Sequence, residues 1–400
     1  MRALCLLSAC LLLAACSSDN DPNAGAGGSG GSSGSVAGAA QGGSGAGSGG
    51  AGVAGGGAPA AGQGGTSAGT AGSSGSGGSS AGTSGSSGSG GALPFVQPSK
   101  LSETGLFSNV ADGTLASGVL EYRPKYELWS DGATKKRWVY LPPGARIDTS
   151  DSQRSAPMDF WRYPPGTKLW KEFSRDGVRV ETRLIQKYLD DRMRERWFMM
   201  AFVWNDAGTD AEAAPDGMMN AKGTPHDVPS QMLCADCHDN VYDRVLGFTA
   251  IQLSHDLPGV KLSQLVSESR LSAAPPAPLT LPGTEAQQNA LGYLHANCGH
   301  CHNENSQHAS LGLYLWLGTE ALGTLQATPA YSTTVNQRAS GPSQPDTDFR
   351  IVAGNPAQSE LYQRMTAYPA GNDLHMPLVG AELIDSSGVM AVEAFIESLQ

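Results

Sequence analysis

The chain has 400 residues, a formal net charge of -11 and a sequence pI of about 5.2. This acidity argues against nucleic acid or an anionic lipid surface as a partner, because both are polyanions. It would suit a basic redox protein, although mild acidity is also ordinary in soluble proteins. The residues after position 92 are numerous enough for two or three domains with cores of their own.

Residues 1–16 are expected to be a lipoprotein signal peptide. Arg2 supplies a positive start and residues 4–13 an apolar core. Leu13-Ala14-Ala15-Cys16 looks like a lipobox, in which Cys16 is acylated and becomes the new N-terminus. The alternative is an ordinary signal peptide cleaved after Ala15. Ser17 follows instead of Asp, and the sorting rule for such lipoproteins then implies the periplasmic side of the outer membrane or the cell surface.

Residues 17–92 are expected to be a disordered tether of Gly, Ser and Ala. The segment holds no aromatic residue and no Lys or Arg, so it cannot bury enough apolar surface to offset its ordering entropy. As a flexible coil it would span on the order of 50 Å. No other stretch approaches the roughly 20 apolar residues of a membrane-spanning helix, so the membrane is expected to be reached through the lipid on Cys16.

Residues 93–230 are predicted to form a β-rich domain. Short segments rich in Val, Tyr, Trp and Phe alternate with Pro-Gly, Asp-Gly and Asn-Asp turns. Such spacing indicates an antiparallel sandwich or barrel. Six of the seven Trp residues lie here and are expected to be core residues. The predicted strands are 119–122, 137–141, 158–161, 168–173, 178–187 and 197–204.

Two Cys-x-x-Cys-His motifs carry the chemistry: Cys234-Ala235-Asp236-Cys237-His238 and Cys298-Gly299-His300-Cys301-His302. Two thiols at this spacing can form thioethers with the two vinyl groups of one porphyrin, and the adjacent His then serves as an iron ligand. We therefore expect two covalently attached haem c groups, with His238 and His302 on the irons. Zinc held by the two Cys pairs is the alternative.

The cysteine count supports this interpretation. Of seven cysteines, three lie in the targeting segment and the other four fall within the two motifs. No thiol is left for a structural disulfide, although the chain is expected to be exported.

Residues 231–282 are expected to be a first haem-binding segment that ends in a Pro-rich bridge over 273–282. No Met lies between His238 and Met365, so the sixth ligand of this haem must come from elsewhere. The iron could also be five-coordinate and open to peroxide or another small ligand. The candidates for the ligand are Met218, Met219, His226 and His255.

Residues 283–400 are predicted to be a helical domain with the second haem. A helix over 285–297 runs directly into Cys298, and Pro356 stands at a natural helix start. Asp385 can cap a last helix. Met376, which precedes Pro377, is the expected sixth ligand because a thioether suits haem iron; His375 or no ligand is the alternative. The apolar stripe of the last helix is Val389, Val392, Phe395, Ile396 and Leu399.

These residues resemble known families. Residues 285–400 resemble the single-haem cytochrome c domain in the helix before Cys298, in Gly-Asn-Pro-x-x-Ser-x-Leu-Tyr over 354–362, and in Met376-Pro377. The region from Leu101 onward looks like a family of bacterial dihaem c-type cytochrome lipoproteins of unassigned function. That second resemblance implies an architecture and no reaction. Its motifs here are Tyr126-Glu127-Leu128-Trp129-Ser130-Asp131-Gly132, Pro165-Gly166-Thr167, Val180-Glu181-Thr182-Arg183-Leu184, Trp204-Asn205 and Tyr293-Leu294-His295-Ala296-Asn297-Cys298.

The predicted fold class is α+β with several domains, an N-terminal antiparallel β-sandwich or barrel followed by an all-α cytochrome c-like domain. The predicted function is electron transfer between redox proteins of the cell envelope. One alternative is a dihaem peroxidase-like enzyme with an open haem at His238. Another is a ligand-binding β domain coupled to a cytochrome c module.

Overall fold

The computed structural model describes residues 95–276, 279–340, 347–366 and 374–400. The predicted signal peptide, the tether and Cys16 lie outside these residues. The described residues belong to one unit, Gly85–Gln400. No helix in the described ranges is long and apolar enough to cross a membrane. The domain boundaries expected at 230/231 and 282/283 stay predictions.

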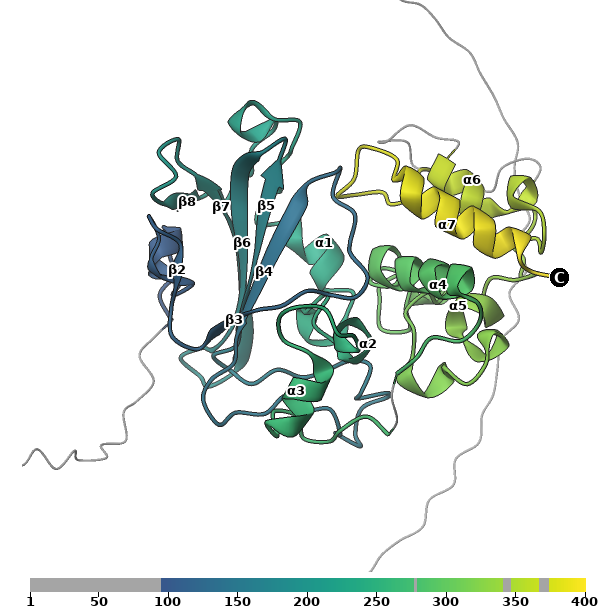
Figure 1. Ribbon diagram of the computed structural model, residues 1–400, viewed down its shortest axis with the longest axis horizontal. Coiled ribbons are helices and arrows are strands. Elements are labelled where there is room, and N and C mark those ends of the chain that lie inside the picture. Colours follow the sequence, from purple (N-terminus) through teal and green to yellow (C-terminus); the bar gives the residue numbers. More distant parts are fainter. Residues whose placement is uncertain (1–94, 277–278, 341–346, 367–373) are drawn as a thin grey trace, which may run out of the picture. The chain divides into compact units, whose positions relative to one another are not determined.

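A six-stranded antiparallel sheet forms the first half of the described chain (Figure 1). Its strands follow one another in chain order, so each pairs with its neighbours in the sequence. The hairpin between the third and fourth strands turns at Asp176-Gly177, where both residues have positive φ, as a tight two-residue turn requires. The strands are β3 (Val119–Glu121), β4 (Thr134–Tyr140), β5 (Lys168–Arg175), β6 (Val178–Leu189), β7 (Glu195–Trp204) and β8 (Ala211–Ala213).

The two faces of the sheet belong to different cores, because successive side chains of a strand point to opposite faces. One face buries Trp138, Trp170 and Leu184 against a small two-stranded sheet of β1 (Phe107–Asn109) and β2 (Thr114–Leu115). The other face carries Val139, Leu169 and Ile185 and packs toward the helices. Figure 1 shows β2 and the helices on opposite sides of the sheet.

The helices are mostly short, and α4 and α7 are longer than the rest. At the start of the last helix, the predicted cap by Asp385 is confirmed. Its carboxylate accepts hydrogen bonds from the amides of Ser387 and Gly388, both at 3.1 Å. The helices are α1 (Cys234–His238), α2 (Ala250–Leu253), α3 (Leu262–Ser267), α4 (Glu285–Asn297), α5 (Pro329–Ser332), α6 (Glu360–Thr366) and α7 (Ser386–Glu397).

Helices α4 and α7 pack closely against each other. The packing depends on Gly388, because a Cβ there would lie 2.0 Å from Cζ of Tyr293 on α4. Val392, Phe395 and Ile396 of the predicted stripe are fully buried. The two helices therefore meet through a small residue and a row of large apolar ones.

The predicted fold class is wrong. Within the described residues no all-α cytochrome c-like domain is present, because helices α4 and α7 share one continuous core with the sheet, from Leu169 to Leu291 and Phe395. In the described residues between α4 and α6 the regular elements are four short 3-10 helices and the four-residue helix α5. The sheet is a single open one, with the separate β1–β2 pair against one face, and neither a sandwich of two comparable sheets nor a barrel.

The predicted strand over 158–161 is also wrong. Ala156 has a φ of 44°, and its carbonyl accepts hydrogen bonds from the amides of Asp159 and Phe160. The segment is therefore a turn, and its apolar side chains reach the core without strand pairing. The other predicted strands lie wholly or partly within β3 to β7.

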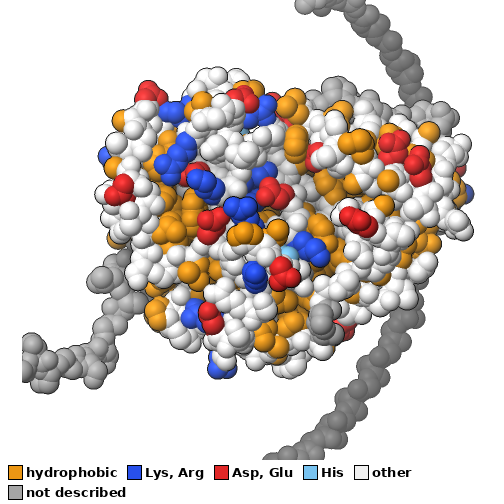
Figure 2. Space-filling model, viewed as in Figure 1, with side chains coloured by type: hydrophobic (Ala, Val, Ile, Leu, Met, Phe, Trp, Pro, Cys, Tyr) orange, Lys and Arg blue, Asp and Glu red, His pale blue; other side chains and the backbone are white. Residues whose placement is uncertain are grey.

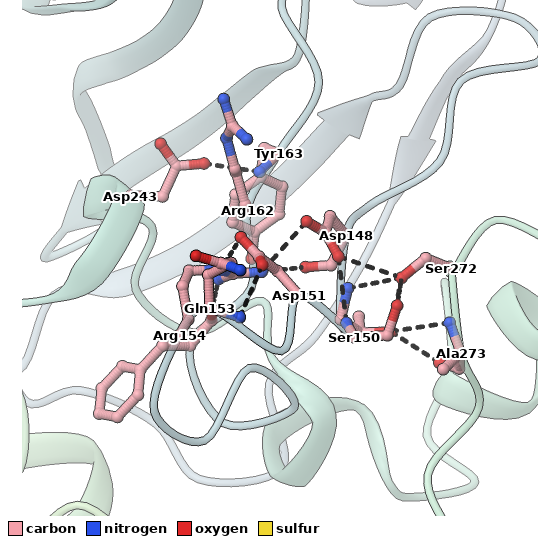
Figure 3. Close-up of polar contacts among 12 residues, drawn as sticks. Asp148, Ser150, Asp151, Gln153, Arg154, Arg162, Tyr163, Asp243, Ser272 and Ala273 are labelled. Atoms are coloured by element: carbon pink, nitrogen blue, oxygen red, sulfur yellow. Dashed lines mark hydrogen bonds and ion pairs between the residues drawn. The ribbon is translucent and has the colours of Figure 1, made fainter.

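This turn belongs to a loop that polar contacts hold in place (Figure 3). Arg154 donates to the carbonyl of Phe160 at 2.6 Å and pairs with Asp148 at 3.4 Å. Thr149 donates from Oγ1 to the carbonyl of Ala273 at 2.7 Å. The loop is thus fixed to the segment that leads into α4.

Candidate functional site

One cavity of about 920 Å³ brings the two Cys-x-x-Cys-His motifs together. Its walls come from β5, β6 and β7 of the sheet, from α1, and from the segments around α4 and α6. Most of the predicted site residues line it, whereas Cys301 does not. Those that do are Cys234, Cys237, His238, Cys298, His302 and Met376.

The first motif forms the short helix α1. Cys234 and Cys237 are three residues apart and therefore lie on one side of the helix. Nδ1 of His238 donates to the carbonyl of Arg244 at 2.5 Å, which leaves Nε2 with the free lone pair. Burial lowers the pKa of His238 to about 4. The ring is therefore neutral at pH 7, the state in which imidazole binds a metal ion.

Asp243 fixes the carbonyl that orients His238. Asp243 and Arg244 have φ values of 56° and 62°, a conformation that needs support from its surroundings. The carboxylate of Asp243 accepts from the amide of Tyr163 at 2.6 Å (Figure 3), from Nζ of buried Lys187 at 2.8 Å and from Nε1 of Trp197 at 2.8 Å. The sequence analysis missed this group, because Lys187 stands near the end of a strand with several other charged and polar residues and gave no signal.

The second motif takes its geometry from α4. The amides of Cys298 and Gly299 both donate to the carbonyl of Leu294. Gly299 is required here, because a Cβ would lie 2.6 Å from the carbonyl oxygen of His295 and 2.9 Å from the backbone of Trp316. Burial lowers the pKa of His302 to about 4. Its buried Nδ1 has no hydrogen-bond partner within the described residues.

The four thiols are free and half-buried. Burial raises the pKa of Cys298 and of Cys301 to about 12, and Cys237 adds to the effect on Cys301. Burial also raises the pKa of Cys234 and Cys237. These thiols lack the thiolate character of a redox-active dithiol. The two motifs are neighbours, since both contribute residues to the wall of one cavity.

Met376 and His375 both stand at the cavity wall. The amide of Met376 donates to the carbonyl of Arg364 at 2.9 Å, and the side chain of Met376 is half-buried. His375 is buried, and its Nδ1 has no hydrogen-bond partner within the described ranges. The two side chains therefore remain alternatives as ligands of the second haem.

The four candidates for the sixth ligand of the first haem differ in their surroundings. Met218 and Met219 line the cavity. His226 also lines it, but its Nε2 lies 2.7 Å from Oε1 of buried Glu181. His255 is not among the lining residues, and both of its ring nitrogens are hydrogen-bonded to backbone groups. The geometry favours the two methionines.

Two further histidines near the second motif differ in role. His295 is buried and Nδ1 accepts from the amide of Leu317 at 3.1 Å, beside the ring of Trp316. It is a structural residue of α4. His300 is buried, lines the cavity and has an Nδ1 without a hydrogen-bond partner within the described residues. Its position inside the second motif gave no signal that it would face the cavity.

A loop from the first half of the chain joins α4 to the C-terminal segment at the cavity wall. The amide of Trp129 donates to Oδ1 of Asn297 at 2.6 Å, and its Nε1 donates to the carbonyl of Leu383 at 3.0 Å. Oδ1 of Asp131 accepts from the amides of Glu382 and Leu383 at 2.9 and 2.8 Å. Each of these four hydrogen bonds has a backbone group as one partner, so the loop is held against both segments.

These residues fit two covalently attached haems. Four unpaired thiols, two neutral imidazoles, buried ring nitrogens without partners and a large, mainly apolar cavity are what such groups require. Across the described ranges, no three His, Cys, Asp or Glu side chains gather as a ready-made metal site. A haem iron would need no more than two ligands from the protein, so its site need not gather three such groups.

Comparison with known proteins finds no matching family model, no curated relative and no similar solved structure.

Proposed function

We propose that this protein is a membrane-tethered dihaem c-type cytochrome that carries electrons between redox partners of the cell envelope. The observation that carries the proposal is that both Cys-x-x-Cys-His motifs open into one cavity. Cys234 and Cys237 would hold one haem and Cys298 and Cys301 the other. When bound, each haem supplies an iron that is reversibly oxidised and reduced by one electron.

The residues of the chain would bind the haems, orient their ligands and shield them from water. His238 is oriented through its Nδ1 bond to the Arg244 carbonyl, as ligating histidines commonly are by a second hydrogen bond. Apolar side chains such as Ile185, Leu313 and Leu315 line the cavity and limit the access of water. Met376 is the proposed sixth ligand beside His302. Its thioether would raise the potential of that site relative to a second His.

The proposed cellular place follows from the sequence. Cys16 would carry the lipid, and residues 17–92 would hold the folded part away from the membrane. The surface viewed in Figure 2 mixes Lys and Arg with Asp and Glu, so on that face the acidic balance does not form one continuous patch. Partner docking there would depend on shape as well as charge.

The test is to count covalent haem by pyridine haemochrome on full-length protein made in a periplasm with cytochrome c maturation. We expect two haems per chain, one after Cys234→Ala with Cys237→Ala, and one after Cys298→Ala with Cys301→Ala. Met376→Ala should keep both haems but remove the ferric absorption band of thioether ligation. Cys16→Ser is the control, with unchanged haem chemistry where the protein is still exported. Protein without covalent haem would overturn the proposal.

A further inference from the structure

Three cationic side chains form a row across the face of the sheet that looks into the cavity. Arg137 on β4 is directly opposite Lys171 on β5, and Lys171 is directly opposite Arg183 on β6. Directly opposed residues on antiparallel strands share a face, with Cβ atoms about 5 Å apart. Like charges in this relation destabilise a sheet. Anionic partners would therefore stabilise this row of cations.

The two cations at the ends of the row have ion pairs with carboxylates. Arg137 lies 3.6 Å from Glu127, and Arg183 lies 2.6 Å from Glu181. Lys171, in the middle, has neither an ion pair nor a hydrogen bond within the described residues; its Nζ lies 4.9 Å from the centre of the Phe173 ring. The ammonium group of Lys171 therefore has no direct ion pair within the described residues.

The cavity is a direction from which an anion can approach Lys171. Lys171 and Arg183 line this cavity, as do the residues of the first motif, Cys234, Cys237 and His238. Burial, together with the neighbouring cations led by Arg137, lowers the pKa of Lys171 well below its usual range. Such a group gains stability when an anion approaches it.

Arg183 can contribute to the same site. Its Nε and Nη2 donate to the two oxygens of Glu181 at 3.0 and 2.6 Å. Its Nη1 has no partner within the part of the chain that the structure describes. A guanidinium with an unpaired Nη1 group thus stands beside an ammonium without an ion pair, and together they match an oxyanion.

We propose that Lys171, with Arg183 beside it, binds a carboxylate or another small oxyanion inside the cavity. In one form the anion is a propionate of the haem on the first motif, and this form rests on the proposed function. In the other form it is a free oxyanion taken from solution. The chemistry of recognition is the same in both.

The experiment compares Lys171→Gln with wild type as full-length, haem-loaded protein. Lys136→Gln is the matched control, since Lys136 is an exposed residue on β4 that points to the opposite face. Haem content, a two-wave redox titration and the binding of inorganic phosphate by calorimetry are measured. Lys171→Arg keeps the charge and should behave as wild type, which separates loss of charge from misfolding.

If the anion is a propionate, Lys171→Gln keeps both haems but lowers the potential of one. The oxidised-to-reduced ratio at a fixed potential then rises roughly tenfold, the size expected for one charge at low effective dielectric. If the anion is free, wild type binds phosphate, and the variant binds it at least tenfold more weakly with both potentials unchanged. Either result supports the site, provided that Lys136→Gln has no effect.

Suppose that the protein holds two haems per chain and that neither the haem potentials nor phosphate binding changes in Lys171→Gln. This result would overturn the inference and leave the proposed function intact. Protein without covalent haem would overturn the proposed function instead. In that case phosphate binding alone tests the anion site. Binding by wild type that is lost in Lys171→Gln supports a site for a free anion. No phosphate binding by wild type refutes the site.

Discussion

The two Cys-x-x-Cys-His motifs are alike in sequence but take their geometry from different sources. The first sits on a five-residue helix whose histidine is oriented by a carbonyl that Asp243 ties to the sheet. The second follows a 13-residue helix that is held by apolar packing against α7. Polar contacts support the first motif and apolar burial supports the second. Different substitutions should therefore destabilise the two motifs.

The largest effect is expected from Phe395→Ala on α7. Phe395 is fully buried in the core that α4 and α7 share with the sheet, and truncation of such a residue costs about 3–5 kcal/mol. The free energy of unfolding from urea titration measures the loss. Met390→Ala, at an exposed position of the same helix, is the control and should change it by no more than about 0.5 kcal/mol. Equal losses in the two variants would contradict the role given to packing.

Asp243→Asn should have an intermediate effect. It weakens the support of the Arg244 carbonyl and removes one of two carboxylates from buried Lys187, whose other partner is Glu195 at 2.8 Å. We expect a loss of about 2–3 kcal/mol, less than for a buried charge with no remaining partner. Asp239→Asn, which breaks only the exposed pair with Arg244, should cost less than about 1 kcal/mol.

The same variant also separates the two motifs spectroscopically. In haem-loaded protein, Asp243→Asn should alter the ferric electron paramagnetic resonance signal of one haem, the one that survives Cys298→Ala with Cys301→Ala. A change confined to the other haem would contradict the link from Asp243 to His238.

Acid should act on the second motif through His295. Burial lowers the pKa of His295 to about 3 from its usual 6.5, so between these values the unfolded chain binds a proton that the folded chain does not. Stability from this group is complete above about pH 6.5 and falls toward pH 3, by at most about 1.4 kcal/mol per pH unit. His295→Asn can keep the acceptor for the Leu317 amide without titrating. Chemical unfolding of haem-free protein at several pH values should give a flatter profile for the variant.

Local patterns predicted several elements well, and non-local contacts explain the rest. Residues close together in the sequence determine three of these elements: the cap at Asp385, the stripe from Val392 to Ile396 and the helix before Cys298. The bonds from Tyr163 and Lys187 to Asp243 join positions far apart in the sequence, with no periodicity to reveal them. The expected separate helical domain was wrong for the same reason, because its apolar stripes do not say which surface they cover.

The haem chemistry expected from the sequence stays a prediction, and the layout of the site was not predicted. The spacing of the thiols and histidines predicted which residues carry the motifs, whereas nothing in the sequence indicated that both motifs line one cavity. The cations at positions 171 and 183 looked like ordinary polar residues of two half-buried strands. Only the register of the strands places them opposite each other and toward the cavity.

The bonds between Asp131 and the amides of Glu382 and Leu383 have a consequence for how the protein is assembled. A chain that emerges from its N-terminus presents all four motif cysteines before residues 382–400 arrive. Until then this part of the cavity wall is missing and α7 cannot cover α4. For the proposed attachment of haem, the order of synthesis thus gives a period in which the thiols are accessible, before residues 382–400 complete the cavity wall.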